Sequence, residues 1–148
     1  MTDPLFLRDD FRWSDDKPMC HFVKAGDFLW FSGIVALDER NEVVGPGDVQ
    51  AQARQIFTRL RDLLAEVGCD LTSVIRLTNY LTVSMDDLEA TRRYWEVRRE
   101  FFGRHRPAST GVKVAALMLP ELLIEIDAVA YAPGAVVGPK LTVLDGRT

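Results

Sequence analysis

The chain has 148 residues, 47% of them hydrophobic, and a formal net charge of −4. This length allows one domain with a sizeable core and is too short to predict two. The 18 Lys and Arg residues are interleaved with 22 acids, which argues against a nucleic-acid partner. The first residues form no leader and no apolar run approaches about 20 residues, so we expect neither a signal peptide nor a membrane span. We therefore expect a cytoplasmic protein without nucleic-acid or membrane partners.

The cysteines and histidines do not have the spacing of metal ligands. Cys20 and Cys69 form no Cys-x-x-Cys pair, and the only histidines are His21 and His105. We expect reduced thiols, no metal and no other cofactor.

The first part of the chain predicts an arm followed by a hairpin. Residues 1–17 mix Asp, Arg and aromatic residues without a period and are expected to form a loosely held N-terminal arm. Residues 21–25 and 28–32 have strand composition and are separated by Gly26-Asp27, which predicts a hairpin turning at the glycine. Gly33 is expected to end the second strand.

Two amphipathic helices are predicted after the hairpin. In the first, apolar residues recur three and four positions apart, and Gly68 is the expected C-cap. Its apolar positions are Val49, Ala53, Ile56, Phe57, Leu60, Leu63, Leu64 and Val67. The second follows Ser84, Asp86 and Asp87 and ends at Gly103. Its stripe comprises Leu88, Tyr94, Trp95, Arg98, Phe101 and Phe102.

Residues 74–83, between the helices, alternate as a strand does. One face holds Ile75, Leu77, Leu81 and Val83, and the other holds Arg76, Thr78, Tyr80 and Thr82. Asn79 falls on the apolar face, where a buried amide needs partners. It either pins a neighbouring loop or lines a pocket.

Residues 106–131 predict two strands flanking a turn, and the second strand has one apolar face and one acidic face. Ile124, Ile126, Ala128 and Ala130 alternate with Glu125, Asp127, Val129 and Tyr131. The whole order predicts an α+β fold with both helices on one face of a mixed sheet. The other face would expose Trp30, Tyr80, Val112, Val114, Val129 and Tyr131 beside the acids. Such an apolar face predicts an oligomer.

Five segments in this order resemble the Rid (reactive intermediate deaminase, YjgF or L-PSP endoribonuclease-like) family. They are residues 26–33, 50–55, 76–81, 106–109 and 124–130. The resemblance covers about Pro18 to Tyr131 and implies a single domain at 18–133, followed by a C-terminal tail at 134–148. It also implies a chorismate-mutase-like fold and a homotrimer with a central β-barrel and three ligand clefts between subunits.

The resemblance assigns roles to residues of this chain. Glu125 matches the family's acid that positions or activates water, and Gly33 matches the glycine whose neighbouring amide, here that of Ile34, points into the site. Deaminating members carry Pro-Ala-Arg-Ser at the start of a strand, where the Arg grips the substrate carboxylate. This chain has Ser109 and then Thr110 there, so it resembles an Arg-less subgroup.

A second departure replaces the family's Pro-Tyr-Ser-Gln by Pro18-Met19-Cys20-His21. Cys20 is a candidate nucleophile or general acid, or else a small buried hydrophobe. Adjacent strand residues point to opposite faces, so Cys20 and His21 are not expected to form a dyad. We assign Met19, Gly33, Ile34, Asn79, Ser109 and Thr110 to substrate binding, and Glu125 and Cys20 to catalysis.

Several of these residues also have a purely structural interpretation. Ser109 and Thr110 either donate hydrogen bonds to a ligand or are ordinary polar residues at a strand edge. Glu125 and Asp127 either serve the site or pair with Arg76 or Lys113 across the subunit contact. His105, with its basic neighbours Arg104 and Arg106, either supplies the missing positive charge or lies in a solvated loop.

Two functions follow. The first is a hydrolytic deaminase of a small enamine or imine, similar to 2-aminomuconate deaminase, with water activated by Glu125. The second is a trimer that binds a small metabolite without catalysis.

Overall fold

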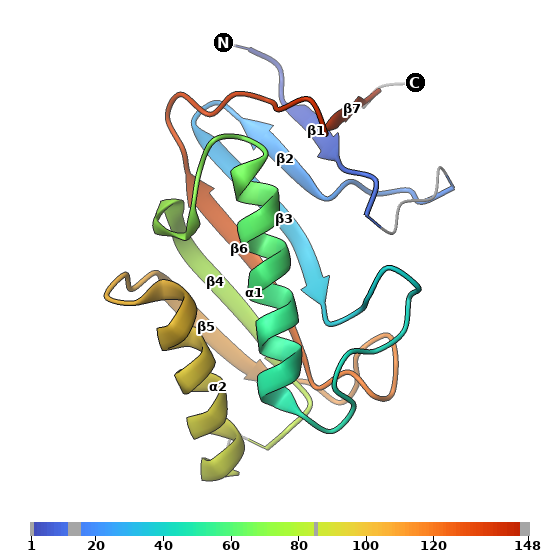
Figure 1. Ribbon diagram of the computed structural model, residues 1–148, viewed down its shortest axis with the longest axis vertical. Coiled ribbons are helices and arrows are strands. Elements are labelled where there is room, and N and C mark those ends of the chain that lie inside the picture. The colour runs from blue at the N-terminus through green and yellow to red at the C-terminus, as the bar shows by residue number, and fades with distance from the viewer. Residues whose placement is uncertain (1, 12–15, 85, 146–148) are drawn as a thin grey trace.

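The computed structural model describes residues 2–11, 16–84 and 86–145, which form one sheet and two α-helices (Figure 1). The strands are β1 Leu5–Arg8, β2 Phe22–Ala25, β3 Phe28–Val35, β4 Val74–Leu81, β5 Ala108–Lys113, β6 Ile124–Tyr131 and β7 Thr142–Leu144. The helices are α1 Val49–Ala65 and α2 Leu88–Phe102, and a short 3-10 helix, η1 Leu71–Ser73, precedes β4.

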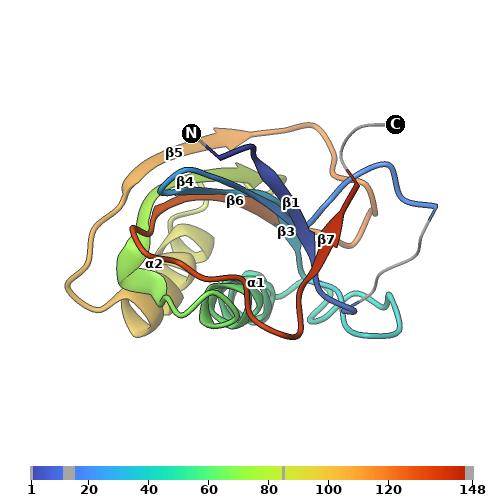
Figure 2. The same cartoon turned by 90° about the horizontal axis from the view of Figure 1, so that it is seen from above.

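The sheet is mixed, with strand order β5-β4-β6-β3-β2-β1-β7. β4 and β5 run parallel, and the other neighbouring strands are antiparallel. A parallel neighbour requires a long crossover, which α2 provides between β4 and β5. Figure 2 shows both helices beneath one face of the curved sheet, with the opposite face left open. The predicted α+β arrangement is therefore confirmed.

The local signals in the sequence produce the predicted hairpin and helices. β2 pairs with β3 around Gly26, which has φ 58°, a conformation that a residue without Cβ adopts at little cost. α1 begins after Asp48, whose carboxylate accepts the N–H groups of Gln50 and Ala51. α2 is capped by Asp87 rather than Ser84 and ends at Gly103.

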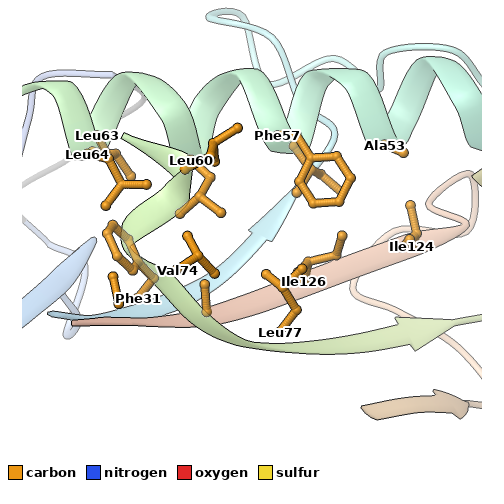
Figure 3. Packing of buried hydrophobic residues seen from close by; sticks show 14 of the residues in the cluster. Phe31, Ala53, Phe57, Leu60, Leu63, Leu64, Val74, Leu77, Ile124 and Ile126 are labelled. Carbon is orange, nitrogen blue, oxygen red and sulfur yellow. The ribbon is translucent and has the colours of Figure 1, made fainter. Parts of the chain in front are cut away.

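The core lies between α1 and the central strands. All eight apolar positions predicted on α1 are buried. In Figure 3, Leu60, Leu63 and Leu64 face side chains of the strands, among them Phe31 and Leu77. Burying one such side chain fully stabilises the fold by about 1.5–3 kcal/mol relative to leaving it exposed. This layer fixes the helix-side face of β3, β4 and β6.

Irregular pairing corrects two sequence-based predictions, and the strand order shows which of the last strands are neighbours. The register between β4 and β6 shifts between Val74 and Arg76, so Val74 is buried and Ile75 is 42% exposed, opposite to the prediction. β3 continues past Gly33 to Val35, because an irregularity between Phe31 and Ile34 absorbs the glycine. β5 and β6 do not pair with each other, since β4 lies between them.

Two short strands form in segments that the sequence pattern left without structure. β1 lies in the expected arm and β7 in the expected tail, and the two pair with each other through Leu7 and Val143. Leu7 is fully buried, so the segment around it is held by the core. On the second helix, Leu88 and Trp95 are exposed rather than part of the buried stripe.

An ion pair ties the residues after β1 to α1. Arg59 Nη1 lies 2.5 Å from Asp9 Oδ2 and Arg59 Nη2 lies 2.6 Å from Asp9 Oδ1. The guanidinium carbon also lies 4.3 Å from the centre of the Phe11 ring. Burial alone would raise the pKa of Asp9, but the contacts with His21 and with the Arg59 guanidinium outweigh it and hold the pKa well below its usual range.

We predict that Asp9→Asn lowers the free energy of unfolding at neutral pH by about 1–3 kcal/mol, because it leaves Arg59 half-buried without its counter-ion. A carboxylate with a lowered pKa stabilises the fold above its unfolded pKa, about 3.9, and loses that effect as the pH falls below it. The deficit should therefore shrink below about pH 4. Urea unfolding across pH measures it. The exposed Asp62→Asn is the control, and an equal loss in both variants would contradict this role.

Candidate functional site

A cavity of about 350 Å³ lies where β2 begins, beside the irregular part of β3. Backbone pairing between the two segments reaches the hydrogen bond from Ser32 N–H to His21 O, at 2.9 Å. Beyond this bond, the second half of β3 no longer pairs with β2, and the cavity lies beside it and reaches α1. The cavity is lined by Phe11, Lys17, Met19, His21, Ser32, Gly33, Ile34, Val35, Arg59, Leu63, Met118 and Glu125.

The absence of a side chain at Gly33 creates the place that the Glu125 carboxylate occupies. A Cβ on Gly33 would lie 2.0 Å from Glu125 Oε1 and 3.0 Å from its carboxyl carbon. The carboxylate therefore rests directly on the backbone of β3. This contact explains why glycine stands at the irregularity: any larger residue would push the carboxylate away.

Glu125 is half-buried, and the structure records no hydrogen bond or ion pair to its carboxylate among the residues it describes. Burial is the main cause that raises its pKa above the usual range, and the charge of Asp127 adds to it. Asp127 itself accepts a hydrogen bond from the Tyr80 hydroxyl at 3.0 Å. A carboxylate with a raised pKa and no fixed partner is suited to accept and return a proton.

Basic side chains share the cavity with Glu125. Lys17, His21 and Arg59 all line it. The charge of Arg59 is compensated by Asp9. His21 also contacts Asp9: its Nδ1 accepts the Asp9 backbone N–H at 3.2 Å and lies 3.1 Å from Asp9 Oδ1. The site thus combines one proton-accepting carboxylate with a basic wall.

Of the other residues assigned from the sequence, Met19, Gly33 and Ile34 line this cavity and Cys20 does not. The Cys20 carbonyl accepts the Ser32 hydroxyl at 2.8 Å, which places its backbone behind the cavity wall. Burial raises the pKa of the Cys20 thiol, which favours the thiol over the nucleophilic thiolate. This geometry fits the structural interpretation of Cys20.

Asn79 and Ser109 form a second cluster. Asn79 is paired with Ile126, whose side chain points to the opposite face of the sheet from Glu125. Asn79 is 2% exposed, and its Nδ2 donates to Ser109 Oγ at 3.1 Å and to Thr110 O at 2.8 Å. The Tyr94 hydroxyl donates to its Oδ1. Asn79 thus joins β4, β5 and α2, as the pinning interpretation expects, although the segment it pins is a strand. The Thr110 hydroxyl instead accepts Arg76 Nη2, at 2.7 Å.

Sequence reasoning missed three residues that position these sites: Arg59, Gln52 and Arg98. Gln52 is fully buried, and its amide bonds Glu121 O and Leu123 N at 2.9 and 2.7 Å, which fixes the entry to β6 just before Glu125. Its place on the apolar stripe of α1 was the available signal. Arg98 Nη1 donates to Ser109 Oγ at 2.8 Å.

The remaining basic candidate, His105, serves a structural contact. Its Nε2 lies 2.5 Å from Val74 O, and its ring stacks on Phe102. Within residues 2–11, 16–84 and 86–145, no three His, Cys, Asp or Glu side chains group as metal ligands. The helices in this part of the chain are also too short or too polar to cross a membrane.

Comparison with known proteins places this fold and site in one family. The sequence profile described as Endoribonuclease L-PSP matches residues 16–132. The chain is 33% identical to the 3-aminoacrylate deaminase RutC of Acinetobacter baylyi over 77% of this chain and 86% of that protein. It is 31% identical to a 2-iminobutanoate/2-iminopropanoate deaminase of Capra hircus, over 76% and 79% of the two chains.

A crystal structure from Mycobacterium tuberculosis, a member of the YjgF/YER057c/UK114 family, has the same fold. It superposes with a TM-score of 0.71 at 28% identity and covers 88% of this chain and 100% of that one. The mixed sheet with both helices on one face defines an α+β protein of the Rid/YjgF type. The chain belongs to the Endoribonuclease L-PSP family.

We predict that Gly33→Ala displaces the Glu125 carboxylate with little loss of stability, because the clashing atom is the end of a flexible side chain. Once displaced toward solvent, the carboxyl group should lose part of its raised pKa. A ¹³C NMR titration of the glutamate carboxyl signals measures the change. Gly111→Ala is the matched control, since a Cβ there meets no atom within 4 Å. An unchanged Glu125 titration in Gly33→Ala would contradict the contact.

Proposed function

We propose that the protein is a hydrolytic deaminase of small enamines or imines, with Glu125 activating water. The main support is the half-buried Glu125 carboxylate, which lies against Gly33 in the cavity. Among the described residues, this carboxylate has no hydrogen-bond or ion-pair partner. The relatives named as 3-aminoacrylate and 2-iminobutanoate/2-iminopropanoate deaminases support the same class of reaction. We propose a cytoplasmic location.

Hydrolysis of an imine requires little more than a carboxylate in a site that is partly shielded from bulk water. Water adds to the carbon of the protonated imine while Glu125 accepts a proton from it, which gives a carbinolamine. Glu125 then returns the proton to nitrogen. The C–N bond breaks as the hydroxyl gives its proton to the Glu125 carboxylate, which leaves a carbonyl compound and ammonia, and the ammonia takes up this last proton as ammonium. An enamine first takes a proton on carbon to become the imine. The raised pKa of Glu125 suits it to both transfers near neutral pH.

We predict that Glu125→Gln lowers ammonia release by about 10²–10⁴-fold, because an amide can neither accept nor return the proton. The measurement is ammonia release from 3-aminoacrylate, 2-aminomuconate and freshly generated 2-imino acids. Glu39→Gln makes the same chemical change at an exposed turn and should keep full activity.

The wild-type protein decides between the two candidate functions. Release that disappears in Glu125→Gln supports the deaminase. No release from any of these substrates by the wild-type chain would favour the second candidate, a non-catalytic trimer that binds a small metabolite. The specific observation for that candidate is the replacement of the strand arginine by Ser109.

We also propose a homotrimer in which the open sheet faces form a central barrel and the ligand clefts lie between subunits. The open face exposes Trp30 by 53%, Tyr131 by 46% and Val112 by 39%. A continuous apolar surface of this kind is uncommon on monomers.

We predict a solution mass about three times the 16.7 kDa of one chain. Trp30→Glu should dissociate the assembly, because it places a charge in an apolar contact. Light scattering coupled to gel filtration measures both. Leu88→Glu, at a residue 79% exposed on α2, should leave the mass unchanged. A monomeric wild-type protein would rule out the trimer.

A further inference from the structure

Three large apolar side chains line the Glu125 cavity without belonging to the core. They are Phe11, Met19 and Met118. In the described part of the chain, none of the three belongs to the hydrophobic core or to the partly buried residues packed against it. Met19 is 50% exposed and Met118 is 92% exposed. Apolar surface that gathers around a cavity in this way is typical of a ligand site.

Phe11 comes from the segment that follows β1. The family profile matches the chain only from residue 16 onward, so this segment lies outside the matched part. Phe11 nevertheless lines the same cavity as Glu125, which lies inside the matched part. One wall of the cavity is therefore built by residues that do not belong to the segment shared with the family.

Hydrogen bonds and an ion pair hold Phe11 in place before any ligand binds. Its backbone N–H donates to Asp9 Oδ1 at 3.1 Å, which closes a turn of the Asx type. The same carboxylate pairs with Arg59 on α1 through both of its oxygens. β1 is anchored by the fully buried Leu7, whose carbonyl accepts the His21 N–H at 2.9 Å. A wall that is ordered in advance loses little conformational entropy when a ligand binds.

The Phe11 ring offers an apolar contact to a ligand. The guanidinium carbon of Arg59 lies 4.3 Å from the ring centre and supports the ring by a cation–π contact. The charge of this guanidinium is already compensated, because both of its terminal nitrogens bond the Asp9 carboxylate. The ring also lines the cavity, so a ligand meets a hydrocarbon surface at this wall.

Met19 and Met118 extend the apolar wall from two other segments, one just before β2 and one between β5 and β6. Methionine side chains are unbranched and adapt to groups of different shape. The cavity volume of about 350 Å³ lies within the range of pockets that enclose organic ligands, roughly 300–1,000 Å³. A three-carbon substrate would leave much of this volume and of the apolar wall without contact.

We propose that Phe11 is a specificity-determining residue. Together with Met19 and Met118 it forms an apolar subsite, which makes the Glu125 cavity prefer ligands with a bulky apolar group over small ones. Asp9 is a positioning residue, because it holds the Phe11 backbone. The inference rests on the proposed function and narrows it: the preferred imine or enamine carries a branched aliphatic or aromatic group.

The test compares the binding of two 2-oxo acids by the full-length protein. Pyruvate and 4-methyl-2-oxopentanoate carry the same carboxylate and the same carbonyl group, and they differ only in the apolar group. The ratio of their affinities therefore isolates the apolar subsite. Calorimetry or NMR titration gives both affinities. The wild-type protein should bind 4-methyl-2-oxopentanoate more tightly by about tenfold or more, because this ligand buries additional apolar surface.

Phe11→Ala should reduce this preference by about fivefold to tenfold and leave pyruvate binding unchanged. Phe11→Leu keeps an apolar side chain at the wall and should keep most of the preference. Phe6→Ala makes the same change on β1, outside the cavity lining, and should leave the ratio of affinities unchanged. A merely structural role of Phe11 would weaken the binding of both ligands together.

Met118→Ala tests the same subsite without a change in the N-terminal segment. Its side chain is 92% exposed, so the variant should fold, and it should also lower the preference. Leu119→Ala, at the next residue and outside the cavity lining, should not. No preference in the wild-type protein, or an unchanged ratio in both Phe11→Ala and Met118→Ala, would overturn the proposal. A smaller solution mass of Phe11→Ala at an unchanged ratio would also overturn it, because the residue would then serve a subunit contact.

Binding and turnover separate this inference from the proposed function. Glu125→Gln should keep the preference for 4-methyl-2-oxopentanoate while losing ammonia release. If the wild-type protein shows the preference through Phe11 but releases no ammonia from any imine, the apolar subsite stands and the deaminase proposal fails. Ammonia release without a preference between the two ligands gives the opposite result.

Discussion

The alternation of side chains along β6 is the constraint on which both the core and the candidate site depend. Because neighbouring residues point to opposite faces, Ile124 and Ile126 can seal the layer beneath α1 only if Glu125 and Asp127 face the other way. A slip of one residue would bury both acids and expose the apolar face. The free-energy cost of burying a carboxylate therefore fixes the register of β6. Glu125 is half-buried and bears part of this cost, which raises its pKa.

Much of this fold could be predicted from the sequence because its central elements have strong periods. α1 and the β2–β3 hairpin carry their own signals in their apolar spacing and in Gly26. β1 and β7 carry almost none, because each is too short to show a period. β1 forms by pairing with β2 and β7, and β7 forms by pairing with β1. Ile75 was assigned to the wrong face because a register shift interrupts an alternation that looks regular in the sequence.

The candidate site divides in the same way. Glu125 and Gly33 could be identified from the family resemblance, and the contact between them explains why the pair occurs together. The partners of Arg59 and Arg98 could not be identified, since neither arginine is close in sequence to the residue that it holds. Replacing a strand arginine by serine looks like a loss in the sequence. In the fold, the Arg98 guanidinium on α2 donates a hydrogen bond to that serine.

The pairing of β1 with β7 has a consequence for the order in which the chain is assembled. Of the described strands, β1 is the first to leave the ribosome and β7 is the last. Until then, the outer edge of β1 has unpaired backbone groups, and such an edge invites pairing with other chains. Residues that follow β1 form part of the cavity wall through Phe11. The cavity lining runs from Phe11 to Glu125, so it is complete once β6 has emerged. A nascent or truncated chain without β7 would keep the outer edge of β1 open and would be prone to association.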